Sequence, residues 1–173
     1  IIGALNFVTT IIRMRAPGMS FFKMPIFIWT VLAAQILQLL GLPALTGAAI
    51  MLFFDLNFGT SFFNPETGGD PVLFQHFFWF YSHPAVYVMV LPVFGIFSEL
   101  FPVYSRKPLF GYKFVAIASF GITILSLVVW VHHMFYTGTP MWMRNVFMFT
   151  TMLIAVPTGC LLYTSPSPRD VST

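Results

Sequence analysis

Three histidines lie inside stretches of this chain that are apolar enough to cross a membrane, and they restrict its fold and chemistry more than any other feature. His83 sits in the run YSHPAVY, which ends at Tyr87, and His132 and His133 sit together in the run WVHHM. An ionisable side chain at membrane depth is costly, so it faces the protein interior, pairs with another group or marks a functional path. The three imidazoles, with a tyrosine four residues after the first, therefore predict a metal site.

The composition of the chain excludes a water-soluble domain. Apolar residues make up 58% of it, charged residues make up 8%, and the mean hydropathy is +0.86. We therefore expect an all-α fold, a polytopic bundle of transmembrane helices. The formal charge of +3, from 8 basic and 5 acidic residues, is too small for a nucleic-acid surface. The single cysteine, Cys160, excludes an intrachain disulfide framework.

Apolar segments divide the chain. They cover residues 1–12, 24–54, 71–103, 112–136 and a stretch that starts near residue 142. A helix needs roughly 20 apolar residues to cross the hydrocarbon core, and the middle three segments are longer than that. The first has the length of a partial helix. The chain starts on Ile1 without the charged region of a secretory signal, so we expect it to be a piece of a longer polytopic protein.

The connections between these segments alternate in charge. Basic residues lie before the second segment and at the junction of the third and fourth, at Arg13, Arg15, Lys23, Arg106, Lys107 and Lys113. The connection between them, residues 55–70, carries Asp55, Glu66 and Asp70 and no lysine or arginine. Basic connections stay on the cytoplasmic side of a membrane, so we place residues 55–70 on the outer side. Asp70 before Pro71 predicts a helix N-cap and a proline at the first helical position.

The spacing of the histidines and their aromatic neighbours fits a metal site. On a helix, His83 and Tyr87 lie one turn apart on the same face, and Trp79 lies one turn before them. His132 and His133 are adjacent, so on a helix they point about 100° apart and reach one ion only along a shared edge. Three neutral imidazoles without thiolates or carboxylates suit copper or zinc, and a missing fourth ligand leaves a position open for substrate. A single buried histidine, in contrast, is more often a hydrogen-bonded residue of the core.

Two other classes of protein also fit this pattern. A polytopic transporter carries intramembrane polar residues and proline-interrupted helices, with its site at the midplane, and a copper-free remnant would keep the pattern without the function. A metal site requires ring nitrogens of His83, His132 and His133 within about 4 to 5 Å of one another, whereas a transporter would scatter them. His76, near the outer end of its segment, fits an interfacial or capping role better than ligation.

Three longer strings of residues resemble one known family. They are WFYSHPAVYVMVLP at residues 79–92, WVHHMF at residues 130–135 and IAVPTG at residues 154–159. These strings are similar to those of subunit I of the haem-copper oxygen reductases, cytochrome c oxidase in particular. The resemblance extends over residues 1–159 and implies a partial transmembrane domain of a twelve-helix subunit: the end of helix four, helices five to seven and the start of helix eight.

The resemblance implies roles for the residues of the metal site. His83, His132 and His133 match the ligands of a copper ion that faces a high-spin haem. Tyr87 matches a tyrosine that is covalently joined to the first histidine and gives an electron and a proton to oxygen. Trp79 matches a tryptophan packed near the copper. The full-length subunit is expected to hold two haems, but their axial ligands match no residue of this stretch, so the fragment alone should be inactive.

The proton path of this chain departs from that of many members of the family. Those members carry a glutamate two residues after the ligand histidine, where this chain has Ala85. In a bacterial subgroup a tyrosine and a serine before the histidine take that role, and Tyr81 and Ser82 match them. Asn6 matches an asparagine that lines the same channel. Hydroxyl groups relay protons through water without holding a charge in a low dielectric, so the replacement is physically reasonable.

A second proton channel of the family also has counterparts here. Ser98, Thr158 and Tyr87 match members of that channel, and Glu99 lies near its expected cytoplasmic mouth. An exposed acid at the end of a helix explains Glu99 equally well. The lysine of this channel has no counterpart, because Leu161 stands at the matching position.

The last residues of the chain do not fit the family. From Cys160 onward the chain reads CLLYTSPSPRD, which turns polar and rich in proline where a membrane helix should continue. This string is similar to a translated sequencing-library adaptor. We therefore expect residues 160–173 to be a non-native tail and exclude them from the fold prediction.

By this resemblance, the chain is a fragment of the catalytic subunit of a terminal respiratory oxidase, which reduces O₂ to water at a haem-copper centre and pumps protons. Cytochrome c or a quinol is the expected electron donor. Other oxidase subunits, O₂ and the lipid bilayer are the expected partners, with no nucleic acid. The tyrosine and serine pair favours a multi-pass protein of the bacterial cytoplasmic membrane over one of the mitochondrial inner membrane.

Overall fold

The computed structural model describes residues 1–109 and 111–164, and every regular element in these ranges is a helix. The elements are α1 (Ile2–Arg13), η1 (Phe21–Lys23), α2 (Ile26–Phe58), η2 (Pro65–Thr67), α3 (Pro71–Ser105), α4 (Tyr112–Ser126), η3 (Trp130–Met134), α5 (Met141–Leu153) and α6 (Ala155–Thr164), where η marks a 3₁₀-helix. Four stretches of the described chain are long and apolar enough to cross a membrane: Ile26–Phe58, Pro71–Ser105, Tyr112–Met134 and Met141–Leu162. The predicted all-α membrane fold is confirmed.

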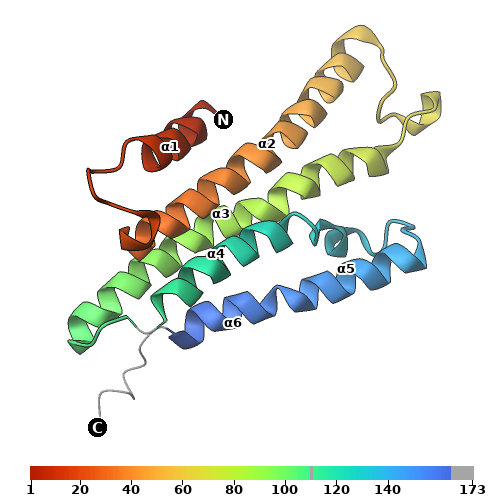
Figure 1. The fold of residues 1–173 in the computed structure, drawn as a ribbon. Coiled ribbons are helices and arrows are strands. Elements are labelled where there is room, and N and C mark those ends of the chain that lie inside the picture. The colour runs from red at the N-terminus through yellow and green to blue at the C-terminus, as the bar shows by residue number, and fades with distance from the viewer. Residues whose placement is uncertain (110, 165–173) are drawn as a thin grey trace.

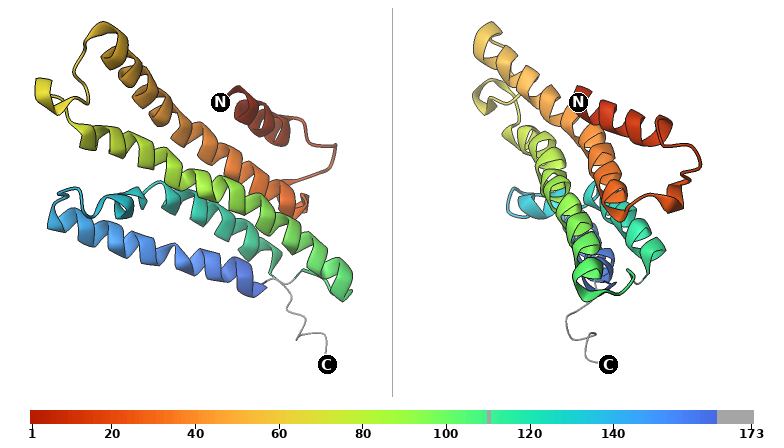
Figure 2. Two further views of the ribbon diagram at one scale, coloured as in Figure 1. Left: turned by 180° about the vertical axis from the view of Figure 1, so that it is seen from behind. Right: turned by 90° about the vertical axis from the view of Figure 1, so that its left-hand side faces the viewer.

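The long helices run up and down beside one another. Figure 1 shows α2 and α3 as an antiparallel pair, with α4 returning beside them and with α5 and α6 nearly in line along the far side of α4. The views in Figure 2 agree with this arrangement, and α1 packs against α2. The acidic loop after α2 and the connection from η3 to α5 lie at one end of the bundle, opposite the connections before α2 and after α3. The acidic and basic connections are thus at opposite ends.

A few residues determine where α2 ends and α3 begins. Asp70 caps α3, because its side chain accepts a hydrogen bond from the backbone N–H of Val72 at 2.8 Å, and Pro71 is the first helical residue. Both features were predicted from the sequence. α2 ends before Gly59, whose φ of 67° lies in the left-handed region that favours glycine.

Two glycines bring α2 and α3 into close contact. A Cβ atom at Gly95 would overlap the hydroxyl oxygen of Thr30 and lie 3.0 Å from Phe27 Cα. A Cβ atom at Gly41 would lie 3.2 Å from Cδ2 of Tyr81. Small residues let membrane helices approach closely, so these glycines fix how α3 lies along α2.

The interior of the bundle lies between α2, α3 and α4. Its fully buried side chains include Leu37, Leu91, Val115 and Ile122. Large apolar side chains such as Met89 and Phe149 are exposed on the outside, and α5 has no buried residue. An apolar outer surface is expected of helices that lie in hydrocarbon.

α4 ends earlier than the sequence predicts. We expected one helix over residues 112–136, but α4 stops at Ser126, and Trp130–Met134 form the 3₁₀-helix η3. Hydroxyl groups along α4 donate to backbone carbonyls of the preceding turn, from Ser119, Thr123 and Ser126. Bonds of this kind weaken and bend helices. Thr150 of α5 then donates its hydroxyl to the carbonyl of Val128 at 2.8 Å, which satisfies a polar group outside the helix.

A second break, at Ile154, separates α5 from α6. Pro157 explains this break, because proline has no N–H and its ring clashes with the carbonyl four residues earlier, that of Leu153. α6 continues into the start of the predicted non-native tail, which is therefore helical there. The rest of that tail, residues 165–173, lies outside the described part of the chain.

Candidate metal centre

The three intramembrane histidines meet between α3 and η3. His83 lies within α3, whereas His132 and His133 lie on η3, which packs against α3. Each ring offers one nitrogen, and these nitrogens all lie within 4.8 Å of one another. The ring nitrogens therefore lie as close to one another as a metal site requires. The scattered arrangement expected of a transporter is not observed for these residues.

The rings approach one another through nitrogen atoms and ring edges. His83 Nδ1 lies 3.1 Å from His133 Nε2. The centroids of the His83 and His132 rings are 4.6 Å apart, with an interplanar angle of 88°. Neighbouring side chains of a 3₁₀-helix point about 120° apart, so the two histidines of η3 approach His83 from different directions. One ion placed between the rings can be reached from all three.

One nitrogen of this cluster lacks a partner. His83 Nε2 is buried and has no hydrogen bond. A buried polar atom left unpaired costs about 1 to 3 kcal/mol, so this nitrogen is free to form a further bond. The cluster contains three imidazoles and no carboxylate or thiolate, a donor set that suits copper or zinc. The residues present therefore fit a single metal ion.

Two side chains support the histidines of η3. Trp79 of α3 stacks on His133 with ring centroids 3.9 Å apart and an interplanar angle of 5°. The hydroxyl of Thr151 on α5 lies 2.9 Å from His132 Nδ1 and donates to the carbonyl of Phe147 at 2.6 Å. Because Thr151 donates its hydroxyl hydrogen to that carbonyl, its hydroxyl oxygen accepts a hydrogen bond from Nδ1–H of His132. Nε2 of His132 then carries no hydrogen and is free to bind a metal. The sequence did not single out Thr151, since a threonine in an apolar helix is ordinary.

Tyr87 lies one turn after His83 on α3, as the spacing predicts. The two ring centroids are 5.0 Å apart at an interplanar angle of 60°. The Tyr87 side chain is half-buried. Its phenol ring thus borders the imidazole whose Nδ1 faces His133 and whose Nε2 is unpaired.

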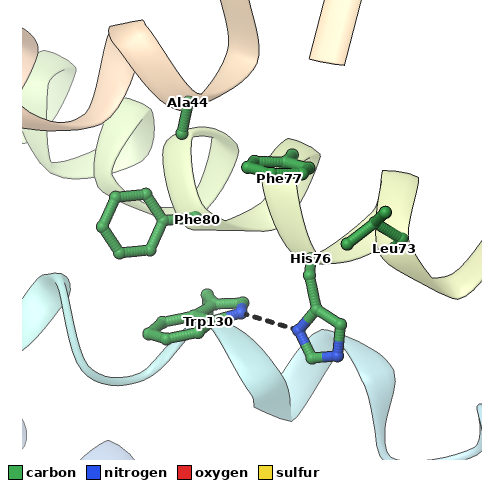
Figure 3. Close-up of a pocket in the computed structure, with 6 residues that line it drawn as sticks. All are labelled: Ala44, Leu73, His76, Phe77, Phe80 and Trp130. Atoms are coloured by element: carbon green, nitrogen blue, oxygen red, sulfur yellow. Dashed lines mark hydrogen bonds between the residues drawn. The ribbon is translucent and has the colours of Figure 1, made fainter. Parts of the chain in front are cut away.

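His76 does not join the cluster. Its Nδ1 accepts a hydrogen bond from Nε1 of Trp130 at 3.3 Å, so it contacts the first residue of η3 rather than capping a helix. Figure 3 shows the two rings beside a largely apolar pocket of about 280 Å³.

The residues matched to the first proton channel lie on two helices. Tyr81 is half-buried on α3 and donates its hydroxyl to Gln38 Oε1 of α2 at 3.4 Å. Ser82 follows it, directly before His83. Asn6 is exposed on α1, which packs against α2. The structure thus directs Tyr81 toward α2 and places Asn6 on a separate helix, α1.

The residues matched to the second channel are spread along α3 and α6. Ser98 is buried on α3, and Thr158 on α6 donates its hydroxyl to the carbonyl of Ile154 at 2.8 Å. Glu99 is exposed, and its Oε1 accepts from the backbone N–H of Phe27 at 2.9 Å. This bond satisfies one of the free N–H groups in the first turn of α2. Glu99 therefore has a structural contact that the sequence did not reveal.

Fold and site together define a class: a polytopic membrane protein with a three-histidine centre between two of its helices. The family model described as Cytochrome C and Quinol oxidase polypeptide I matches residues 1–165. The chain belongs to this family, which confirms the family predicted from the three strings of residues.

Similar proteins support the same assignment. The chain is 59% identical to cytochrome c oxidase subunit 1 of Synechocystis sp., 52% to that of Thermostichus vulcanus and 49% to that of Cereibacter sphaeroides. Each alignment covers 94% of this chain. The chain spans about 30% of the length of the curated relatives it matches.

Proposed function

We propose that this chain is part of the catalytic subunit of a terminal respiratory oxidase that reduces O₂ to water at a haem-copper centre and couples the reaction to proton pumping. The observation that carries the proposal is the convergence of His83, His132 and His133 in a chain of this family. The similar proteins are named cytochrome c oxidase subunit 1, so cytochrome c is the proposed electron donor. A quinol is the alternative, since the family description includes quinol oxidases.

The three histidines would hold one copper ion through defined atoms. His83 would bind through Nδ1 and His133 through Nε2, because two nitrogens 3.1 Å apart can both lie roughly 2 Å from one ion. His132 would bind through Nε2, since Thr151 engages its Nδ1. When bound, the copper and the haem facing it supply the electrons and the binding position for O₂. The full-length subunit is proposed to hold two haems.

Tyr87 is proposed to be joined covalently to His83. Its ring lies beside an imidazole whose Nε2 is buried and unpaired, which makes that nitrogen available for a bond to a ring carbon. Forming the bond removes the N–H and C–H hydrogens as two protons and two electrons, and O₂ is the oxidant. The phenol O–H remains free. It would supply a proton and an electron close to the metal when the oxygen bond breaks.

Protons would reach the centre through hydroxyl groups. Tyr81 and Ser82 come directly before His83 on α3. Their hydroxyl groups would replace the carboxylate that other members carry at the position of Ala85. The bond from Tyr81 to Gln38 gives this path a polar contact across the α2–α3 packing. The further residues assigned to proton paths are Asn6 on the first and Ser98, Thr158, Tyr87 and Glu99 on the second.

We assign residues 1–159 to the oxidase domain and residues 160–173 to a non-native tail derived from an adaptor. The family match extends to residue 165, so resequencing the gene across codon 159 decides where the native sequence ends. A native gene that encodes the tail would contradict this boundary. The protein is placed in the bacterial cytoplasmic membrane as a multi-pass subunit, with other oxidase subunits as partners.

A chimera tests the proposed function. Residues 1–159 of this chain replace the matching stretch of the Cereibacter sphaeroides subunit, which is 49% identical. We expect the purified chimeric oxidase to bind copper at this centre and to consume O₂ with its reduced donor. A matched chimera with His132→Leu and His133→Leu should keep its haems and consume no O₂. O₂ uptake that persists in the double variant would contradict the proposal.

A further inference from the structure

We propose that His76 is a positioning residue of the metal centre: by accepting a hydrogen bond from Trp130, it fixes η3, and with it His132 and His133, against α3. The inference rests on the proposed function, since it concerns how the same centre is held. His76 lies outside the ligand cluster and acts only through Trp130.

η3 depends on its surroundings for its position. It comprises Trp130–Met134, which is 5 residues, and 3₁₀-helices have poorer hydrogen-bond geometry than α-helices. α4 ends at Ser126, so no continuous helix carries η3. The place of the two histidines must therefore be set by side-chain contacts with the neighbouring helices.

Trp130, the first residue of η3, makes such contacts on several sides. Its indole Nε1 donates to His76 Nδ1 on α3 at 3.3 Å. Its ring meets Phe80 of α3 edge on, with centroids 5.1 Å apart, and Phe147 of α5 edge on, with centroids 4.8 Å apart. A hydrogen bond weakens steeply when its angle falls below about 120°, so it fixes direction more strictly than ring contacts do. His76 supplies the directional contact.

The surroundings make this bond costly to break. Figure 3 shows it beside a pocket lined by Ala44 of α2 and by Leu73, Phe77 and Phe80 of α3. These walls are apolar side chains, so His76 is the side-chain acceptor that the lining of the pocket offers to the indole N–H. A hydrogen bond in apolar surroundings is stronger than one in water, and an unpaired donor there is unfavourable. Loss of the bond would leave the half-buried indole N–H without this partner.

His76, which accepts the hydrogen bond from Trp130, lies on the same face of α3 as His83, the proposed metal ligand. The residues of this face are His76, Phe80, His83 and Tyr87, spaced by four, three and four residues as one helical stripe requires. His76 and His83 are two turns apart, about 10.5 Å along the axis. Trp130 and His132 are separated by one residue on η3. A loss of the bond at His76 would thus shift the ligands of η3 relative to the ligand of α3.

The test uses the full-length oxidase that contains this stretch, purified with its partner subunits. His76→Leu removes the acceptor and keeps apolar bulk, and Trp130→Phe removes the N–H and keeps a ring. We expect each variant to bind copper about 10-fold more weakly in competition with a chelator, the lower end of the range for groups that orient metal ligands. The copper X-ray absorption spectrum should change as well, while the haem spectra stay the same.

Three further variants separate positioning from a general structural role. His76→Asn keeps an acceptor near the place of Nδ1 and should restore most of the copper affinity. Gln75→Leu makes a comparable polar-to-apolar change at the neighbouring position of α3 and should leave the affinity unchanged. The double variant of His76→Leu with Trp130→Phe should bind copper as weakly as either single variant, because both residues act through one bond.

Full copper affinity and an unchanged spectrum in His76→Leu would overturn the inference, and so would additive losses in the double variant. If the His76→Leu protein does not assemble, the Trp130→Phe variant tests the inference instead. Full copper affinity in Trp130→Phe would also overturn the inference. An unchanged oxidase without copper at this centre would instead contradict the proposed function, so the two failures are distinguishable.

Discussion

His83 stands on a 35-residue α-helix, whereas His132 and His133 stand on a 5-residue 3₁₀-helix. The first is held by the backbone of α3, which continues unbroken through Pro84. The other two depend on side chains from elsewhere: Trp79 stacks on one, and Thr151 bonds to the other. One side of the centre is therefore positioned by the helix that carries it, and the other side is positioned by its neighbours.

This difference predicts which substitutions should alter the copper affinity of the centre. A change on the α3 side acts through the ligand or through the residue one turn away, because the helix itself sets their spacing. On the η3 side, residues that never touch the ion should alter its affinity, because they orient its ligands. The following predictions test whether the two sides differ in this way.

The largest effect is expected when the α3 ligand is removed. His83→Ala should lower copper affinity by more than roughly 100-fold, beyond the loss expected when a ligand only loses its orienting partner. Elemental analysis should show one copper ion fewer per oxidase than in the unchanged protein, with the haem content unchanged. If this variant kept its full copper content, His83 would not be a ligand of the centre.

Tyr87→Phe should separate metal binding from turnover. The variant keeps the ring beside His83 and loses the hydroxyl, so copper content should be unchanged while O₂ uptake falls on the order of 100-fold or more, as when a positioned proton donor is lost. Mass spectrometry of the linked peptides should show the bond between His83 and Tyr87 in the unchanged oxidase. Unlinked peptides of normal mass would exclude that bond.

A smaller effect is expected from the support of η3. Thr151→Val removes the hydroxyl that accepts from His132 Nδ1 and keeps the shape of the side chain, so copper affinity should fall about 10-fold. Thr151→Ser retains the hydroxyl and serves as the control. Equal copper affinity in all three proteins would show that η3 needs no such support, and the contrast with α3 would fail.

The smallest effect on the centre is expected from the α2–α3 packing. Gly95→Ala places a methyl group against Thr30, so thermal unfolding in detergent should show a loss of about 1 to 3 kcal/mol, as overpacking does. Gly47→Ala is the control, since a Cβ there meets nothing within 4 Å. Copper content should stay the same in both. A loss as large at Gly47 would contradict the packing argument.

The α3 side of the centre could be predicted from the sequence, and the η3 side only in part. His83 and Tyr87 share a face because of their spacing, and Asp70 caps α3 because of its position before Pro71, so both features depend on residues close in the chain. His132 and His133 were recognised as candidate ligands, but a regular helix was expected where a 3₁₀-helix occurs.

The contacts that support η3 could not be predicted because they join distant residues. Thr151 is 19 residues from His132, and His76 is 54 residues from Trp130. Thr151 is an ordinary residue of its helix, and His76 was expected only in an interfacial or capping role. The contacts of both residues appear only when the helices pack. The pairing of Glu99 with the first turn of α2 escaped prediction for the same reason.

Copper K-edge X-ray absorption of the full-length oxidase tests the central claim most directly. The account predicts that the difference between the spectrum of the unchanged oxidase and that of the variant with His132→Leu and His133→Leu corresponds to one copper ion with three imidazole nitrogens at roughly 2 Å. Identical spectra, or a difference signal without imidazole nitrogens, would contradict the assignment of His83, His132 and His133 as its ligands.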